Sequence, residues 1–183
     1  YAKQTATGKT MVVDMLNYGA AAQVNFDYGT SNLANSGLSD AQKASGTTTA
    51  PTMEDKQVKG NNYFATRFIL SSAIQVQVAF RNLTTDMYAI YTYENANGDV
   101  KSVRVEGEDF IVLSGKPAIV ELSALVYADA RAQVKVTVYN ADGSVHGYAE
   151  DSIESCCARA TKGGDVFEAL MAFGDSAKAH LYK

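Results

Sequence analysis

Residues 133–148 read "QVKVTVYNADGSVHGY", and this stretch predicts a β-hairpin. Three valines in "VKVTV" alternate with polar residues, which is the period-2 pattern of a half-buried strand. Asp142-Gly143 follows, and this dipeptide favours the tight turn that joins two antiparallel strands. On the second strand we expect Val145 to point inward with those valines. The outward face of the hairpin is then predicted to carry Lys135, Thr137, Tyr139, His146 and Tyr148.

The β pattern extends in both directions from this hairpin, over residues 59–151. "AIQVQVAF" at 73–80 alternates strictly, and Asn97-Gly98 marks a second tight hairpin. Strands joined by such turns form antiparallel sheets. About seven short strands in this region therefore predict an antiparallel β-sandwich.

Both ends of the chain are predicted to be helical. In residues 1–58 we expect a long helix at about 11–26 and a short one at 38–45, which Ser39 caps. In residues 152–183 a short helix comes first, and a break at 162–164 separates it from a long helix capped by Asp165. We therefore predict an α+β fold, a single module over 1–183 in which helical segments at both termini flank an antiparallel β-sandwich.

The two long terminal helices are similar in sequence. Residues 15–26, "MLNYGAAAQVNF", align without a gap with residues 170–181, "LMAFGDSAKAHL". Two amphipathic helices can resemble each other by chance. The alternative is that the chain is a segment of an array whose units each end in this helical pair. The start at Tyr1, with neither a signal peptide nor an initiator Met, favours a segment of a longer protein.

Composition excludes several classes of function. The 183 residues are 46% hydrophobic and carry a net charge of −4, with Lys and Arg scattered along the chain. Nucleic-acid binding needs a concentrated basic face, so we expect no nucleic acid as a partner. No apolar run reaches the roughly 18 residues of a membrane span, so we expect no membrane insertion. Cys156 and Cys157 are adjacent and are predicted to stay reduced and to have no function beyond packing.

No motif in the sequence predicts catalysis, a metal or a cofactor. "ATGKT" at 6–10 lacks the first glycine of a phosphate-binding loop. Asn95, Asn97, Asp99 and Glu106 have the spacing of calcium ligands, but the loop lacks the required central glycine and lies in a hairpin. The two histidines have no third partner at zinc-ligand spacing. We therefore predict that the protein is not an enzyme and uses no cofactor.

Tyrosine is the unusual element of the composition, with eleven Tyr and no Trp. Tyr combines a large contact area with a polar tip, which suits protein interfaces. The candidate binding residues are therefore the five outward residues of the hairpin, Lys135, Thr137, Tyr139, His146 and Tyr148, together with Tyr91 and Tyr93 on an earlier strand. Half-buried strand aromatics without a binding role remain the alternative.

Four segments of the chain carry a resemblance to a known kind of module. These are "VVDMLNYGAAAQ" at 12–23, "LANSGLSDAQKA" at 33–44, "SIESCCARA" at 152–160 and "ALMAFGDSAKAHL" at 169–181. They resemble a recurring non-catalytic module of large multidomain secreted or cell-wall-anchored surface proteins of anaerobic clostridial gut bacteria. The adjacent cysteines depart from the pattern, because such modules more often have an aromatic residue or Ala there.

The resemblance implies an extracellular setting, on the cell surface or secreted, with neighbouring modules in the same chain. It implies a binding role toward a host or partner protein such as immunoglobulin. The alternatives that it leaves open are a carbohydrate-binding module of a glycan-degrading complex and a structural spacer. It supplies no catalytic motif and no single ligand.

Overall fold

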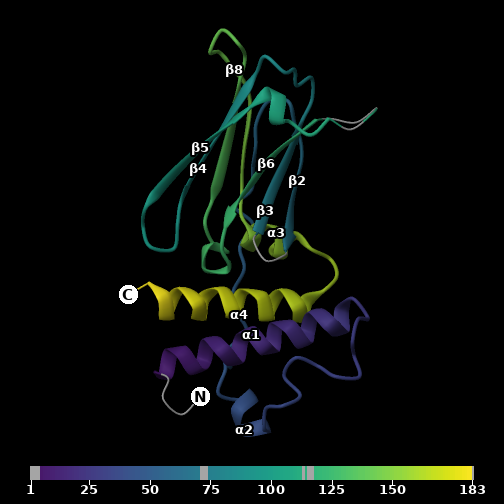
Figure 1. The fold of residues 1–183 in the computed structure, drawn as a ribbon, viewed down its shortest axis with the longest axis vertical. Helices are drawn as coiled ribbons and strands as arrows, with labels where there is room; N and C mark the ends of the chain where they lie inside the picture. The colour runs from purple at the N-terminus through teal and green to yellow at the C-terminus, as the bar shows by residue number, and fades with distance from the viewer. Residues whose placement is uncertain (1–4, 71–73, 113, 115–117, 183) are drawn as a thin grey trace. The chain divides into compact units, whose positions relative to one another are not determined.

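The computed structural model describes residues 5–70, 74–112, 114 and 118–182 (Figure 1). The chain divides into two compact units. Unit 1 combines Tyr1–Met53 with Cys157–Lys183, and unit 2 is Glu54–Cys156. Unit 1 is helical and unit 2 contains the β-strands.

Unit 1 is built from α1 (Ala6–Asn25), α2 (Asp40–Lys43) and α4 (Gly164–Leu181). The Thr5 hydroxyl accepts a hydrogen bond from the Gly8 amide, which starts α1 earlier than the sequence pattern predicted. The predicted cap at Ser39 is confirmed, and Gln42 completes a capping box. The predicted cap at Asp165 is wrong, because Gly163 with φ of 87° precedes the helix and Asp165 lies in its first turn.

The long helices of unit 1, α1 and α4, pack side by side in opposite directions (Figure 1). Near their middles the rings of Tyr18 and Phe173 stack, with centroids 6.3 Å apart. The loop after α2 is attached to α1 through Asp14. This carboxylate accepts hydrogen bonds from the Thr47 amide at 2.8 Å and from the Thr47 hydroxyl at 2.7 Å.

Unit 2 contains two antiparallel sheets. The five-stranded sheet has the order β1-β8-β7-β4-β5, and the three-stranded sheet has the order β2-β3-β6. The strands are β1 (Val58–Lys59), β2 (Tyr63–Leu70), β3 (Ile74–Phe80), β4 (Tyr88–Glu94), β5 (Val100–Glu106), β6 (Ala118–Leu125), β7 (Val134–Tyr139) and β8 (Val145–Asp151). The helix α3 (Ile153–Arg159) begins in unit 2 and ends in unit 1. An α+β fold with antiparallel sheets is confirmed.

Both predicted hairpins are confirmed. Asn97-Gly98 joins β4 to β5 and Asp142-Gly143 joins β7 to β8. Gly98 and Gly143 have φ of 85° and 83°, a conformation that residues with a Cβ rarely adopt. Short-range turn chemistry thus sets the connection of these strands.

The core of unit 2 contains the alternating valines of β7 together with aromatic residues. Val134, Val136 and Val138 are buried as predicted. Tyr91 of β4 is buried in the same layer and donates its hydroxyl hydrogen to the Val120 carbonyl of β6, at 2.8 Å. This bond joins the two sheets.

The predicted inward position of Val145 is wrong, since its exposed fraction is 56%. The register between β7 and β8 shifts, because Val138 pairs with Gly147 while Tyr139 pairs with Val145. This irregularity inserts one extra residue, His146, so Val145 lies on the outward side with Tyr139, while Tyr148 keeps the outward position that the sequence suggested. Gly147 takes an inward position, where a Cβ would overlap the carbonyl oxygen of Asn61.

The adjacent cysteines form no disulfide, and Cys157 is buried while Cys156 is half-buried. We expect the double variant Cys156→Ala and Cys157→Ala to fold and to lose at most about 1–3 kcal/mol of unfolding free energy. The loss is limited because each substitution removes only the sulfur atom of a small side chain. Urea unfolding followed by circular dichroism measures the loss. An unfolded double variant would contradict a purely packing role.

Candidate functional site

The candidate site is the outer face of the five-stranded sheet, defined as the face opposite the one that carries Tyr91. Alternation and strand pairing assign its members. They are Tyr88, Ile90 and Thr92 on β4, Ser102, Arg104 and Glu106 on β5, Lys135, Thr137 and Tyr139 on β7, and Val145, Tyr148 and Glu150 on β8. The face therefore combines aromatic, apolar and charged side chains.

An aromatic row crosses the middle strands of the outer face. Tyr88 and Tyr139 pair across β4 and β7, and their rings stack with centroids 5.0 Å apart and an interplanar angle of 15°. The guanidinium carbon of Arg104 lies 3.7 Å from the Tyr88 ring centroid. Because β5 and β7 lie on opposite sides of β4, Arg104 and Tyr139 cover opposite faces of the Tyr88 ring.

Arg104 is held over the ring by Glu106. Its Nε lies 2.5 Å from Oε1 of Glu106, and its Nη2 lies 3.1 Å from Oε2. These hydrogen bonds lower the pKa of Glu106 and raise the pKa of Arg104. The two-pronged contact orients the guanidinium, so Glu106, Arg104, Tyr88 and Tyr139 form one continuous row of contacts.

Tyr148 forms the second aromatic element of the outer face, with an exposed fraction of 36%. It pairs with Thr137 on β7, and its ring extends over Gly60, where a Cβ would overlap the ring carbons. Beside it, Lys135 and Glu150 form an ion pair at 3.3 Å. A glycine at position 60 thus leaves room for an exposed ring near the edge of the sheet.

Four of the seven predicted binding residues lie together on the outer face. Lys135, Tyr139 and Tyr148 are available to a partner, whereas Thr137, with an exposed fraction of 9%, is nearly covered by its neighbours. The structure therefore brings together the part of the predicted set that lies on β7, with Tyr148 from β8.

Tyr91 and Tyr93, which the sequence predicted as binding residues, are buried and do not lie on the outer face. Tyr91 is 0% exposed and Tyr93 is 7% exposed, because odd-numbered positions of β4 face the core. Their neighbours Tyr88 and Ile90 take the outer face instead. Alternation within "YAIYTYE", residues 88–94, is the signal that would have separated the two sets.

The expected position of His146 beside Tyr148 is also wrong. His146 is the extra residue at the register shift, so it has no partner across the ladder. Its Nε2 lies 2.9 Å from the carbonyl oxygen of Arg81, and the side-chain amide of Asn62 donates to the backbone carbonyl of His146 at 2.8 Å. These contacts engage the His146 ring and backbone within unit 2 itself.

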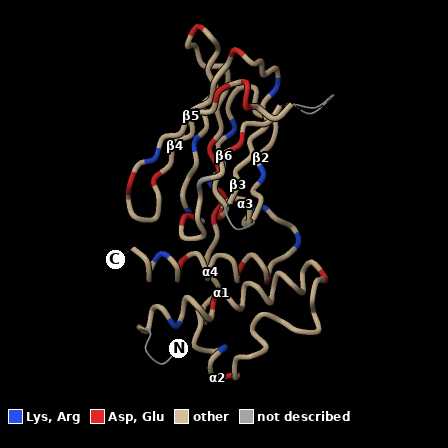
Figure 2. Tube along the Cα trace, viewed as in Figure 1, with Lys and Arg blue, Asp and Glu red and all other residues tan. Residues whose placement is uncertain are grey.

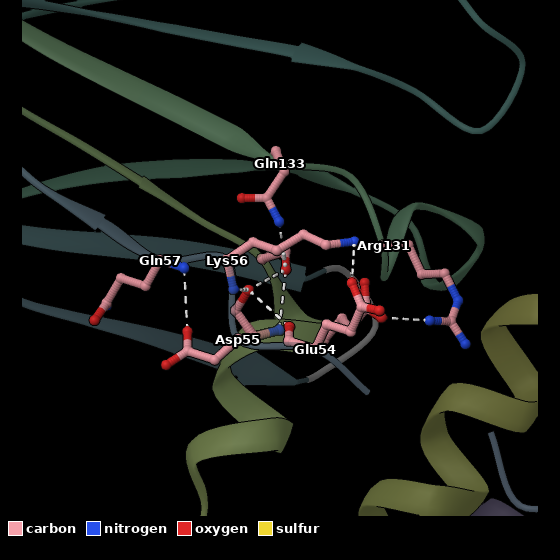
Figure 3. A network of polar contacts seen from close by, with 9 residues as sticks. Glu54, Asp55, Lys56, Gln57, Arg131 and Gln133 are labelled. Atoms are coloured by element: carbon pink, nitrogen blue, oxygen red, sulfur yellow. Dashed lines mark hydrogen bonds and ion pairs between the residues drawn. The ribbon is translucent and has the colours of Figure 1, made fainter. Parts of the chain in front are cut away.

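A buried polar network surrounds the start of α3 (Figure 3). Gln133 donates to the Ser152 hydroxyl at 3.1 Å, and Ser152 contacts the Ser155 hydroxyl at 3.0 Å. The Ser152 oxygen also accepts from the Ser155 amide, and the Ser155 oxygen accepts from the Lys56 amide at 2.9 Å.

The two serine hydroxyls of this network are buried and bonded to backbone groups. Ser152 therefore acts as the N-terminal cap of α3, and Ser155 attaches the segment around Lys56 to that helix. Neither histidine of the chain takes part in these bonds. We call this network the polar joint, because it attaches the segment around Lys56 to the start of α3. A substrate cannot approach hydroxyls that are enclosed in this way, so the role of the network is structural.

The segment with calcium-like spacing forms a self-contained turn. The Asn95 side-chain oxygen accepts hydrogen bonds from the Asn97 and Asp99 amides, at 3.1 Å and 2.8 Å. Asp99 pairs with Lys101 at 3.2 Å, which contributes to its lowered pKa. Across the residues that the structure describes, no group of three His, Cys, Asp or Glu side chains is placed to hold a metal.

In comparisons with known proteins, no protein-family model, no curated protein and no solved structure matches the chain. Among the described helices, none is both long enough and apolar enough to cross a membrane. Figure 2 shows Lys and Arg spread over strands and helices rather than gathered on one element. The geometry of the outer face is therefore the main support for a function.

Proposed function

We propose that the protein is a non-catalytic binding module that contacts a partner protein through the outer face of the five-stranded sheet. The observation that carries this proposal is the contact row of Arg104, Tyr88 and Tyr139, with Tyr148 exposed nearby. Tyr and Arg are enriched at the energetic centres of protein interfaces. We further propose that the two sheets pack as a β-sandwich, which the Tyr91–Val120 hydrogen bond supports.

The charges around the aromatic row suit a specific protein contact. Lys135 and Glu150 lie on one part of the face, and Arg104 and Glu106 lie on another. Both pairs join opposite charges, so the face has no single strong sign. Such mixed charges favour a partner with complementary charges and disfavour binding to a uniformly charged polymer.

Carbohydrate binding is the second candidate, and the ring geometry makes it the weaker one. A sugar that stacks on an aromatic residue needs a free ring face. Both faces of the Tyr88 ring are covered, by Arg104 and by Tyr139. Tyr148 is the one ring among these three whose exposed fraction reaches 36%, so it is the residue that favours a glycan.

The proposed setting is extracellular, on the surface of a bacterial cell or in a secreted multidomain protein. This part of the proposal rests on the resemblance of the terminal and middle segments to modules of clostridial surface proteins. The same resemblance makes immunoglobulin the first partner to test. A spacer module, with no ligand of its own, is the remaining alternative.

Replacing Tyr139 and Tyr148 together with Ala is expected to weaken partner binding by at least about tenfold, or ~1.4 kcal/mol. The reason is that a few exposed rings contribute most of the energy of an interface. Surface plasmon resonance against serum and secretory immunoglobulin, with a glycan panel in parallel, measures the change. The unfolding free energy should fall by about 1–2 kcal/mol, because the Tyr88–Tyr139 stack is lost.

Tyr28→Ala is the matched control, since Tyr28 is an exposed tyrosine in unit 1. It should leave both binding and unfolding unchanged. Unchanged binding of a folded Tyr139 and Tyr148 double variant would show that the partner uses another face. Absence of binding to every protein and glycan tested would favour the spacer alternative.

A further inference from the structure

The two long helices of unit 1 are similar in sequence, and the structure places them in contact with each other. The gap-free alignment equates Tyr18 with Phe173 and Asn25 with His180. Continued toward the N-terminus, the same offset equates Gly8 with Gly163. These three pairs allow the symmetry of the helix pair to be tested.

The central contact joins two equivalent residues. Tyr18 stacks on Phe173, with centroids 6.3 Å apart and an interplanar angle of 18°. In an antiparallel pair, a residue meets its own equivalent only where a twofold axis passes between the helices. The stack therefore marks the position of an approximate twofold axis.

The contacts at the two ends of the pair interchange under that axis. A Cβ placed on Gly8 would lie 3.0 Å from Cε1 of His180, and one placed on Gly163 would lie 3.4 Å from Oδ1 of Asn25. Exchanging each residue for its equivalent converts the first contact into the second. Three contacts along the pair thus agree with one approximate twofold arrangement, in the form of a symmetric dimer interface within a single chain.

We propose that this helix pair also forms between chains, so that α1 of one copy pairs with α4 of a second copy and the two copies exchange helices. Every contact of the pair is available in the exchanged form, including the hydrogen bond between Thr7 Oγ1 and His180 Nδ1 at 3.2 Å. Exchange of an identical element is a low-cost route to dimers. The partner that covers the contacting faces of α1 and α4 is thus a second copy of this chain.

The connections of both helices favour exchange. Residues 26–53 follow α1 and contain only the four-residue helix α2. Before α4 the chain passes through Gly163, whose φ of 87° and lack of a side chain permit a change of direction. No short rigid turn therefore forces α1 and α4 of the same chain to pair with each other.

The test uses two full-length variants with like charges at the centre of the pair. One carries Tyr18→Lys and Phe173→Lys, and the other carries Tyr18→Glu and Phe173→Glu. Within either chain the like charges repel, whereas a mixture allows each Lys to meet a Glu of the other chain. At roughly 0.1–1 mM, near the effective concentration of linked segments, light scattering should show a mixture with twice the monomer mass.

A third variant, Tyr18→Lys with Phe173→Glu, is the matched control, because it places opposite charges within one chain and should dimerise less than the mixture does. If the like-charge variants lose helix on their own, circular dichroism should show that mixing restores it. A mixture that keeps the monomer mass, without a gain in helix, would overturn the proposal.

Discussion

Tyr91→Ala is expected to lower the free energy of unfolding by about 3–5 kcal/mol, because it removes a fully buried aromatic ring and leaves a cavity. Tyr91 is 0% exposed and joins the two sheets of unit 2 through Val120. Urea unfolding, followed by circular dichroism of the β signal, measures this loss. A loss under about 1 kcal/mol would mean that the two sheets collapse into the cavity that the removed ring leaves.

Tyr91→Phe is the control that separates the ring from its hydroxyl. It keeps the ring and removes one buried hydrogen bond, so we expect a loss of about 1 kcal/mol. Burial raises the pKa of the Tyr91 hydroxyl above its ordinary value of 10.0, with a smaller contribution from Glu121. Above about pH 10 the unfolded chain therefore releases a proton that the folded chain keeps.

The sign of this pH effect follows directly. Where the folded state holds more protons, the stability falls as the pH rises, by about 1.4 kcal/mol per pH unit for one proton. The wild-type protein should thus lose stability above pH 10 more steeply than Tyr91→Phe does. Equal slopes for the two proteins would contradict the burial of this hydroxyl in the folded state.

The two hairpin turns and the cap of the short helix α2 are the features that the sequence predicted best. Asn97-Gly98 and Asp142-Gly143 form the expected hairpins, and Ser39 caps the short helix as expected. Each of these features depends on a few neighbouring residues whose backbone preferences are strong. The starts of α1 and α4 were less accurate, because Thr5 and Gly163 lie outside the amphipathic pattern.

The composition of the site depended on pairings that the sequence does not show. The extra residue in β8, His146, lies opposite the step from Val138 to Tyr139, so Val145 lies outward and His146 has no place in the ladder. Such a shift depends on the partner strand and on the close approach of the segment at Asn61 to Gly147. Tyr139 reaches Tyr88 only because β7 lies next to β4, and no local pattern states this pairing of strands that are far apart in the sequence.

The second large effect is expected at the ion pair between Arg131 and Glu154, which lies at the polar joint beside α3. The side chain of Glu154 is 6% exposed, and that of Arg131 is 34% exposed, with Nη1 2.5 Å from Oε1. Removing one partner of a buried ion pair leaves a charge without compensation, which typically costs about 3–5 kcal/mol. Because Arg131 is partly exposed, water screens the pair, and we expect Arg131→Ala to cost about 2–3 kcal/mol.

The asymmetry of burial makes this prediction specific. Glu154→Gln should cost less than Arg131→Ala, because the arginine that remains can be hydrated whereas the buried carboxylate cannot. Lys135→Ala is the matched control, since it breaks the more exposed pair with Glu150 and should cost under about 1 kcal/mol. Adding Glu154→Gln to Arg131→Ala should recover part of the loss, as a double-mutant cycle measures. If Arg131→Ala costs no more than Lys135→Ala, the ion pair behaves as a surface pair and the joint beside α3 is held by its serine hydrogen bonds instead.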